Sequence, residues 1–136
     1  MPGVLELYKH LNPDDPMPEY AAAAAQWSKL LGSQITQVFV ADLGGKVVSS
    51  CVLAIVPNLA RGARPFAVVE NVVTHPDYRK KGVGGTVLKT ALGAAWDAGC
   101  YKVMLATGSK NESTLKFYEG VGFKRNTKTF YEIRRR

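Results

Sequence analysis

The stretch Arg79-Lys80-Lys81-Gly82-Val83-Gly84-Gly85 follows a β-branched run at residues 68–74 and precedes a segment whose apolar residues recur at helical spacing. A strand, a basic glycine-rich turn and a helix start, in that order, are typical of phosphate-binding sites. Glycines let backbone N–H groups approach an anion, the helix start adds partial positive charge, and arginine and lysine supply counter-charge. The sequence therefore predicts a ligand that carries phosphate.

The glycine turn alone does not identify that ligand. It matches neither the P-loop pattern GxxxxGK[ST] nor the dinucleotide-binding pattern GxGxxG. A glycine pair between a strand and a helix also occurs for purely structural reasons. The ligand class has to come from the other segments of the chain.

Size and charge restrict the class of protein. With 136 residues, 46% of them hydrophobic, the chain is expected to form a single globular domain over residues 1–136. Residues 1–60 carry a net charge of −2 and residues 61–136 a net charge of +9. The basic half suits a polyanionic partner, either nucleic acid or a phosphorylated cofactor. Because no RNA-binding motif or helix-turn-helix signature is present, we expect no nucleic-acid partner.

Targeting and metal signals are absent from the sequence. No apolar run is long enough to cross a bilayer, and the N-terminus does not resemble a secretory signal, so we expect a cytoplasmic protein without a membrane partner. Cys51 and Cys100 are then expected to be reduced and buried. His10 and His75 are far apart, and no cluster has metal-ligand spacing, so no metal site is predicted.

Periodicity and turn residues predict a mixed α/β (α+β) fold. The strand–helix–strand segment at residues 66–107 implies a parallel strand pair, and the hairpin before it implies an antiparallel part. Helices should then cover both faces of the sheet. The expected strands are residues 4–11, 37–42, 47–56, 66–74 and 101–107; the expected helices are residues 18–32, 83–99 and one that starts near 111; residues 57–65 should form a loop and residues 122–133 a closing hairpin.

Two segments taken together resemble a known family. The pattern Arg79-x-x-Gly82-x-Gly84, after His75-Pro76-Asp77-Tyr78, resembles motif A of the GNAT superfamily of N-acetyltransferases, which use acetyl-CoA. The segment Asn111-Glu112-Ser113-Thr114-Leu115-Lys116-Phe117-Tyr118-Glu119-Gly120-Val121-Gly122-Phe123 is similar to motif B, written N-x-x-A-x-x-[LF]-Y-E-x-x-G-F. Thr114 stands where the family commonly has alanine. The resemblance is close over residues 66–126 and covers residues 36–65 in element order only.

The resemblance implies the acyl-CoA N-acyltransferase fold, with a mostly antiparallel sheet in which the strands at residues 68–74 and 101–107 splay apart. The pantetheine arm of acetyl-CoA would fill that gap and pair with the strand as an added strand would. The pyrophosphate would lie on the N–H groups of the glycine turn. The implied cofactor-binding residues are Val72, Val73, Thr74, Arg79, Lys80, Lys81, Gly82, Val83, Gly84, Gly85, Asn111 and Tyr118.

The same resemblance implies direct attack of a neutral amine on the thioester. Tyr118 would donate its O–H to the departing sulfur, and a backbone N–H near Val73 would stabilise the oxyanion. Glu70 is the candidate base, directly or through a water. Its alternative role is a structural carboxylate paired with Lys102. The neighbouring Asn71 is expected to point to the opposite face of the strand.

Two other residues in the motifs also have alternative roles. Tyr118 is otherwise a core aromatic beside Phe117 at helical spacing. Asn111 caps the second motif's helix, contacts the cofactor, or does both.

The acceptor is less well determined, and we expect a small-molecule amine. Arg61 and Arg64 would suit a phosphate or carboxylate, although a solvated loop explains them as well. The segment Cys100-Tyr101-Lys102-Val103 is similar to one in hexosamine-phosphate acetyltransferases and favours an aminosugar phosphate. The alternatives are a protein amine as acceptor and an acyl-CoA-binding regulator without turnover. A homodimer is compatible with the resemblance.

Overall fold

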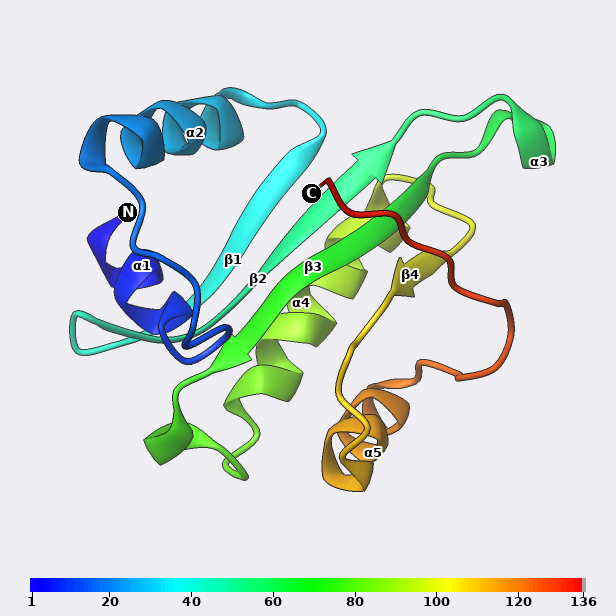
Figure 1. Cartoon of the computed structure of the whole chain (residues 1–136). Helices are drawn as coiled ribbons and strands as arrows, with labels where there is room; N and C mark the ends of the chain where they lie inside the picture. The colour runs from blue at the N-terminus through cyan, green and yellow to red at the C-terminus, as the bar shows by residue number, and fades with distance from the viewer. Residues whose placement is uncertain (136) are drawn as a thin grey trace. The chain divides into compact units, whose positions relative to one another are not determined.

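The structure is a computed structural model that describes residues 1–135, and it divides into two compact units, Met1–Leu105 and residues 106–135. Each unit is described by itself. The single domain expected from chain length therefore stays a prediction. The elements follow one another as α1(Pro2–Tyr8), α2(Tyr20–Gly32), β1(Thr36–Leu43), β2(Lys46–Val56), α3(Ala60–Ala63), β3(Phe66–Thr74), a 3-10 turn (Pro76–Tyr78), α4(Val83–Asp97), β4(Val103–Leu105) and α5(Glu112–Val121) (Figure 1).

The first unit is built on a four-stranded sheet in the order β1-β2-β3-β4. The pairs β1–β2 and β2–β3 are antiparallel, and β3–β4 is parallel, which confirms the mixed and mostly antiparallel sheet. A tight turn joins β1 to β2, with positive φ at Gly44 and Gly45 as such hairpins require. The Asp42 carboxylate accepts a hydrogen bond of 2.7 Å from the Gly45 N–H and so fixes this turn.

The parallel pairing of β3 with β4 is short. It joins Ala67 to Val103, Val68 to Met104 and Val69 to Leu105, and then ends. Residues 70–74 of β3 therefore have no strand partner on this side within the described chain. Since β4 spans three residues, the strand expected over residues 101–107 is correct in place and too long in extent.

A β-bulge interrupts the pairing of β3 with β2. Val52 pairs with Glu70 and Ser50 pairs with Val73, so two residues of β3 oppose Cys51 alone. Asn71 has a φ of 53°, a left-handed conformation that asparagine tolerates better than most residues. Glu70 and Asn71 are both exposed, and the strict alternation expected of them is therefore broken by the bulge.

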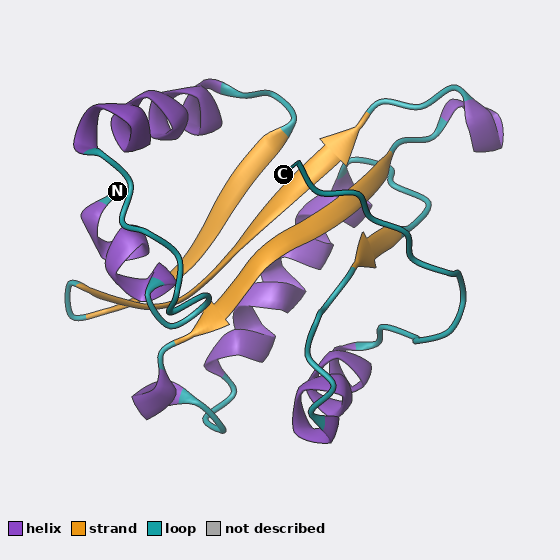
Figure 2. Ribbon diagram, in the orientation of Figure 1, coloured by secondary structure: helices purple, strands orange, loops and turns teal. Residues whose placement is uncertain are grey.

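Helices cover both faces of the sheet, as expected (Figure 2). Helix α4 crosses behind the strands in Figure 1 and packs against β1, β2 and β3. Helix α1 lies in front and packs against β2 and β3, while α2 contacts β1. The buried apolar side chains of these helices are Val4 and Leu7 of α1 and Val87, Leu88, Ala91 and Ala95 of α4.

Three expectations for local structure are wrong. Residues 2–8 form a helix instead of part of a strand, because Pro2 suits a first helical position and Val4 and Leu7, three apart, are buried on one side. The loop at residues 57–65 contains the short turn α3. No strand forms between residue 122 and residue 135, so the closing hairpin is absent from the described chain.

The expectations for the cysteines are confirmed in part: both Cys51 and Cys100 are buried free thiols. Cys51 is completely inaccessible, and burial raises the pKa of its thiol from the usual 9.0 to about 11. A thiol that stays protonated in the folded protein is a poor nucleophile. Cys51 is therefore a core residue beneath the bulge.

We predict that this thiol makes stability depend on pH in the alkaline range. Between about pH 9 and pH 11 the unfolded thiol loses its proton while the folded one keeps it, so the free energy of unfolding falls as pH rises. Urea unfolding at several pH values should give a shallower decline for Cys51→Ala than for the parent. Burial raises the pKa of Tyr8 as well, and the neighbouring Cys51 raises it further, so Cys51→Ala also removes part of the Tyr8 contribution and the decline becomes shallower for both reasons. Equal slopes for the two proteins would contradict the prediction.

Candidate active site

The glycine turn leads directly into α4. Gly82 is the N-cap residue of the helix and has φ 80° and ψ 0°, a left-handed conformation that favours glycine. It offers no side-chain cap, so the first N–H groups of the helix lack the usual capping acceptor. Lys80 also has a positive φ, of 60°. The turn thus leads into a helix N-terminus without a side-chain cap, an arrangement that is compatible with the predicted anion site.

Three basic side chains surround this helix start, and all are exposed. The Arg79 Nε donates a hydrogen bond of 3.0 Å to the Thr74 carbonyl, which folds the turn back onto the end of β3. The Lys81 ammonium lies 5.6 Å from the ring centre of Tyr78. Neither these two nor Lys80 forms an ion pair with another described residue, so their charge is available to an anion.

The backbone of residues 72–74 is partly occupied. The Ser49 hydroxyl donates to the Val73 carbonyl at 3.1 Å and lies 2.9 Å from the Thr74 hydroxyl. A carbonyl oxygen has two lone pairs, so Val73 and Thr74 can still accept from a ligand amide. Ser49 thus holds the backbone of the candidate cofactor-binding residues 73 and 74. The sequence does not predict this contact, because a single serine within an apolar strand belongs to no recognisable motif.

Glu70 is the first residue of β3 beyond the parallel pairing, and its side chain is exposed. It forms no ion pair with any described residue. The alternative role, a structural pair with Lys102, is wrong because the Lys102 ammonium lies over the rings of Phe66 and Tyr101, at 5.7 and 5.4 Å. The Glu70 carboxylate thus has no charged partner among the described residues.

The second unit contains the remaining two candidate residues. The Asn111 side chain accepts a hydrogen bond of 3.0 Å from the Ser113 N–H, so Asn111 caps α5. The Tyr118 ring lies 5.3 Å from that of Phe117 and 6.3 Å, edge to face, from that of Phe123. The aromatic packing that was the alternative role of Tyr118 is therefore present.

An ion-pair cluster ties the segment after α5 back to the helix. The Arg125 guanidinium lies 2.9 Å from the Glu112 carboxylate and 3.0 Å from that of Glu119. The hydrogen bond and charge of Glu112, with the charge of Glu119, raise the pKa of Arg125. These exposed pairs add modestly to stability.

The candidate residues are thus distributed over two units. The first contains Glu70, the three candidate residues 72–74 of β3 and the glycine turn between β3 and α4. The second contains Asn111 and Tyr118. Within the described residues no group of three or more His, Cys, Asp or Glu side chains could hold a metal ion.

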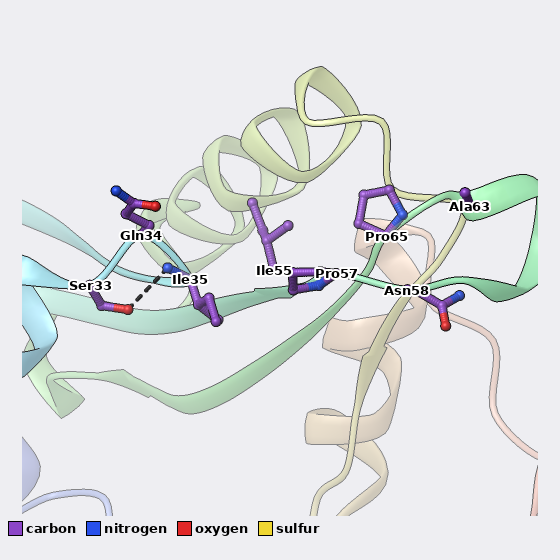
Figure 3. A pocket seen from close by; sticks show the side chains of 8 residues that line it. All are labelled: Ser33, Gln34, Ile35, Ile55, Pro57, Asn58, Ala63 and Pro65. Atoms are coloured by element: carbon purple, nitrogen blue, oxygen red, sulfur yellow. Dashed lines mark hydrogen bonds between the residues drawn. The ribbon is translucent and has the colours of Figure 1, made fainter.

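A hollow of the first unit is lined by none of these candidate residues (Figure 3). It has a volume of about 630 Å³ and contains no titratable side chain. Because Ile55 pairs with Ala67, it lies near the beginning of β3, at the end remote from the glycine turn. Its lining residues are Ser33, Gln34, Ile35, Ile55, Pro57, Asn58, Ala63 and Pro65.

Comparison with known protein families assigns the chain to the acetyltransferases. The model described as "Acetyltransferase (GNAT) family" matches residues 4–123. The chain belongs to the GNAT acetyltransferase family, which confirms the resemblance, the fold class and the enzyme class that the sequence predicts.

Individual relatives agree with this assignment. Glucosamine 6-phosphate N-acetyltransferase of Trypanosoma brucei brucei is 33% identical over 120 residues, which are 88% of this chain and 80% of that protein. The structure of a presumed acetyltransferase from Agrobacterium tumefaciens str. C58 is 46% identical with a TM-score of 0.93, over 98% of this chain and 92% of that one.

A more distant structure shares the fold alone. An aminoglycoside N-acetyltransferase solved in complex with CoA is 20% identical with a TM-score of 0.80, over 98% of this chain and 88% of that chain. Neighbours of this fold thus hold coenzyme A.

No described helix of the present chain is both long and apolar enough to cross a bilayer.

Proposed function

We propose that this protein transfers the acetyl group of acetyl-CoA to a primary amine of a small molecule. The observation that carries the proposal is the single strand β3, which loses its parallel partner after Val69, presents Glu70 next, and ends in the basic glycine turn. An extended cofactor with a diphosphate at one end and a thioester at the other matches this order of features.

In this proposal the diphosphate of acetyl-CoA lies on the N–H groups at the start of α4, with Arg79, Lys80 and Lys81 as counter-charges. The pantetheine amides pair with the backbone of residues 72–74. Acetyl-CoA supplies an activated thioester carbonyl. The chain's own part is to hold that carbonyl beside Glu70 and to offer an N–H near Val73 to the oxygen on which negative charge develops.

The transfer itself needs two proton movements. The amine nitrogen forms a bond to the acetyl carbon, and the carbon–sulfur bond breaks. Glu70 accepts a proton of the amine, directly or through a water, and Tyr118 donates its O–H proton to the leaving sulfur. The role of Tyr118 rests on its position in the second family motif, which Asn111 begins.

For the acceptor, we propose an aminosugar phosphate. A relative that this chain matches over most of its length is named glucosamine 6-phosphate N-acetyltransferase, and the segment Cys100-Tyr101-Lys102-Val103 favours the same class. The basic charge of residues 61–136 suits two phosphorylated ligands. A protein amine as acceptor is the second candidate within the family.

The test is a turnover screen. The protein is incubated with acetyl-CoA and glucosamine 6-phosphate, glucosamine, or a peptide with a free N-terminus, and the release of coenzyme A thiol is followed. We expect release with glucosamine 6-phosphate. Binding of acetyl-CoA, seen as thermal stabilisation, without turnover of any amine would instead support the acyl-CoA-binding regulator.

We predict that Tyr118→Phe lowers kcat by roughly 10- to 100-fold, because the leaving thiolate loses its proton donor. The dissociation constant of acetyl-CoA, measured by calorimetry, should stay within about twofold, since the ring remains. Tyr131→Phe is the matched control, as Tyr131 is 86% exposed and lies outside the motif, and its kcat should equal that of the parent. Equal kcat values in Tyr118→Phe and the parent would remove Tyr118 from the mechanism.

We predict that Glu70→Gln lowers kcat by about 100-fold or more near neutral pH, because a neutral amide does not accept the amine's proton. The loss should shrink at alkaline pH, where more of the acceptor is already the neutral amine. Asp97→Asn, another exposed carboxylate without an ion-pair partner in the described chain, serves as control. A pH–rate profile of Glu70→Gln that coincides with the parent's would leave Glu70 as a surface residue.

A further inference from the structure

Two histidines that are far apart in the sequence meet at the end of β3. The rings of His10, which follows α1, and His75, which follows β3, lie 4.6 Å apart between their centres and meet edge to face. In Figure 1 the segment after α1 passes the end of β3, where this contact forms. The Tyr78 ring also packs edge to face against His75, at 5.6 Å. Since the His75 side chain is only 18% exposed, these two rings hold it in one orientation.

The His75 ring caps the turn that leads to the basic residues. Its Nδ1 accepts a hydrogen bond of 3.1 Å from the Asp77 N–H. Because Pro76 has no N–H, the Asp77 N–H is the first donor that this turn has to satisfy. Asparagine, aspartate, serine and threonine are the usual residues for this task. Histidine performs it only while Nδ1 carries no proton, which assigns the proton of the neutral ring to Nε2.

The capped turn determines how the chain leaves β3. The His75 N–H donates to the Val48 carbonyl at 2.8 Å, so the start of the turn is fixed to β2. At the end of the turn the Arg79 Nε donates to the Thr74 carbonyl at 3.0 Å, which folds the chain back onto the strand. The two lysines of the glycine turn follow directly. A change of direction at His75 is therefore carried into the start of α4.

Tyr78 connects the same packing to two lysines. The ammonium groups of Lys46 and Lys81 lie 5.5 and 5.6 Å from the centre of its ring. A cation over an aromatic face is attracted by the negative potential of the ring, so both ammonium groups are oriented by Tyr78. Lys46 begins β2. Three segments of the first unit thus converge on the turn that carries the basic residues.

We propose that His75 is a positioning residue for the site of the cofactor's diphosphate, and that His10 acts through it. The neutral His75 ring caps the turn and so sets the path of the basic residues toward the anion. This inference rests on the proposed function, in which the diphosphate lies at the start of α4. His75 takes no part in the chemical step.

Three substitutions separate the cap from the packing of the ring. His75→Asn keeps an acceptor for the Asp77 N–H and removes the ring; Asn111 of this chain accepts from the N–H two residues further on in the same way, at 3.0 Å. His75→Phe keeps a ring and removes the acceptor, and His75→Ala removes both. By calorimetry we expect coenzyme A to bind the Phe and Ala variants about 5- to 10-fold more weakly than the parent. His75→Asn should bind it within about twofold of the parent.

A purely structural role of the ring gives the opposite order. Parent-like affinity in His75→Phe, with weak binding in His75→Asn, would overturn the proposal, and so would equal affinity in all four proteins. At saturating acetyl-CoA, kcat should stay within about twofold in every variant, because the cap acts on binding. A fall in kcat with unchanged affinity would contradict this. Ser33→Ala is the control: its hydroxyl accepts from the Ile35 N–H at 3.0 Å, and its loss should leave the affinity unchanged.

The part of His10 is tested through His75. His10→Ala should weaken the binding of coenzyme A about threefold in the parent, because the His75 ring loses one of its supports. In the His75→Asn background the same substitution should have no effect, since no ring remains for His10 to hold. An equal loss in both backgrounds would show that His10 does not act through His75.

These measurements are made without an amine, so they do not depend on turnover. If the parent binds coenzyme A but acetylates no amine, the proposed reaction fails and the binding order of the variants still decides the role of His75. If the parent binds no coenzyme A, both proposals are wrong.

Discussion

The early end of the parallel pairing between β3 and β4 is the constraint on which the other features of this protein depend. Three residue pairs join the strands, and the next residue along β3 is Glu70. Unpaired strand edges invite association with other extended chains. Here that edge lies between an exposed carboxylate and a basic helix start, so the same edge can receive an extended ligand with amide groups.

An open edge can exist because β3 is held from its other side. The antiparallel ladder with β2 continues past the bulge to Thr74, and the buried Ser49 hydroxyl ties both strands together there. Beneath the sheet, α4 packs its apolar side chains against three strands. The strand therefore keeps its shape without a second neighbour. The bulge at Asn71 interrupts the alternation of the side chains at the point where the parallel pairing has ended.

The excess of basic residues in the second half of the sequence is visible in the first unit as two groups of side chains. Two groups of basic side chains lie at opposite ends of β3, one on the glycine turn and one around Tyr101, and neither forms an ion pair within residues 1–135. The two groups are about 30 Å apart along one strand, and Glu70 lies between them.

The sequence by itself determined the family, the glycine turn, helices α2, α4 and α5, and the strands from β1 to β3. Glycine positions, the helical spacing of apolar residues and the two motifs are local features, so they can be recognised in the sequence without knowledge of the tertiary structure. The strand predicted over residues 4–11 was wrong because a short alternating stretch also fits a helix with one buried side, and only packing against β2 decided for the helix at residues 2–8.

Tertiary structure alone decided the bulge at Asn71, the length of β4 and the partners of Lys102. Each of these depends on which residues of a distant segment stand opposite, and pairing register leaves no local trace in composition. The sequence alone allows an ion pair between Glu70 and Lys102. In the structure the Lys102 ammonium lies over the aromatic rings of Phe66 and Tyr101 instead. The sequence thus predicted the carboxylate, and the fold determined that it forms no ion pair with the other residues that the structure describes.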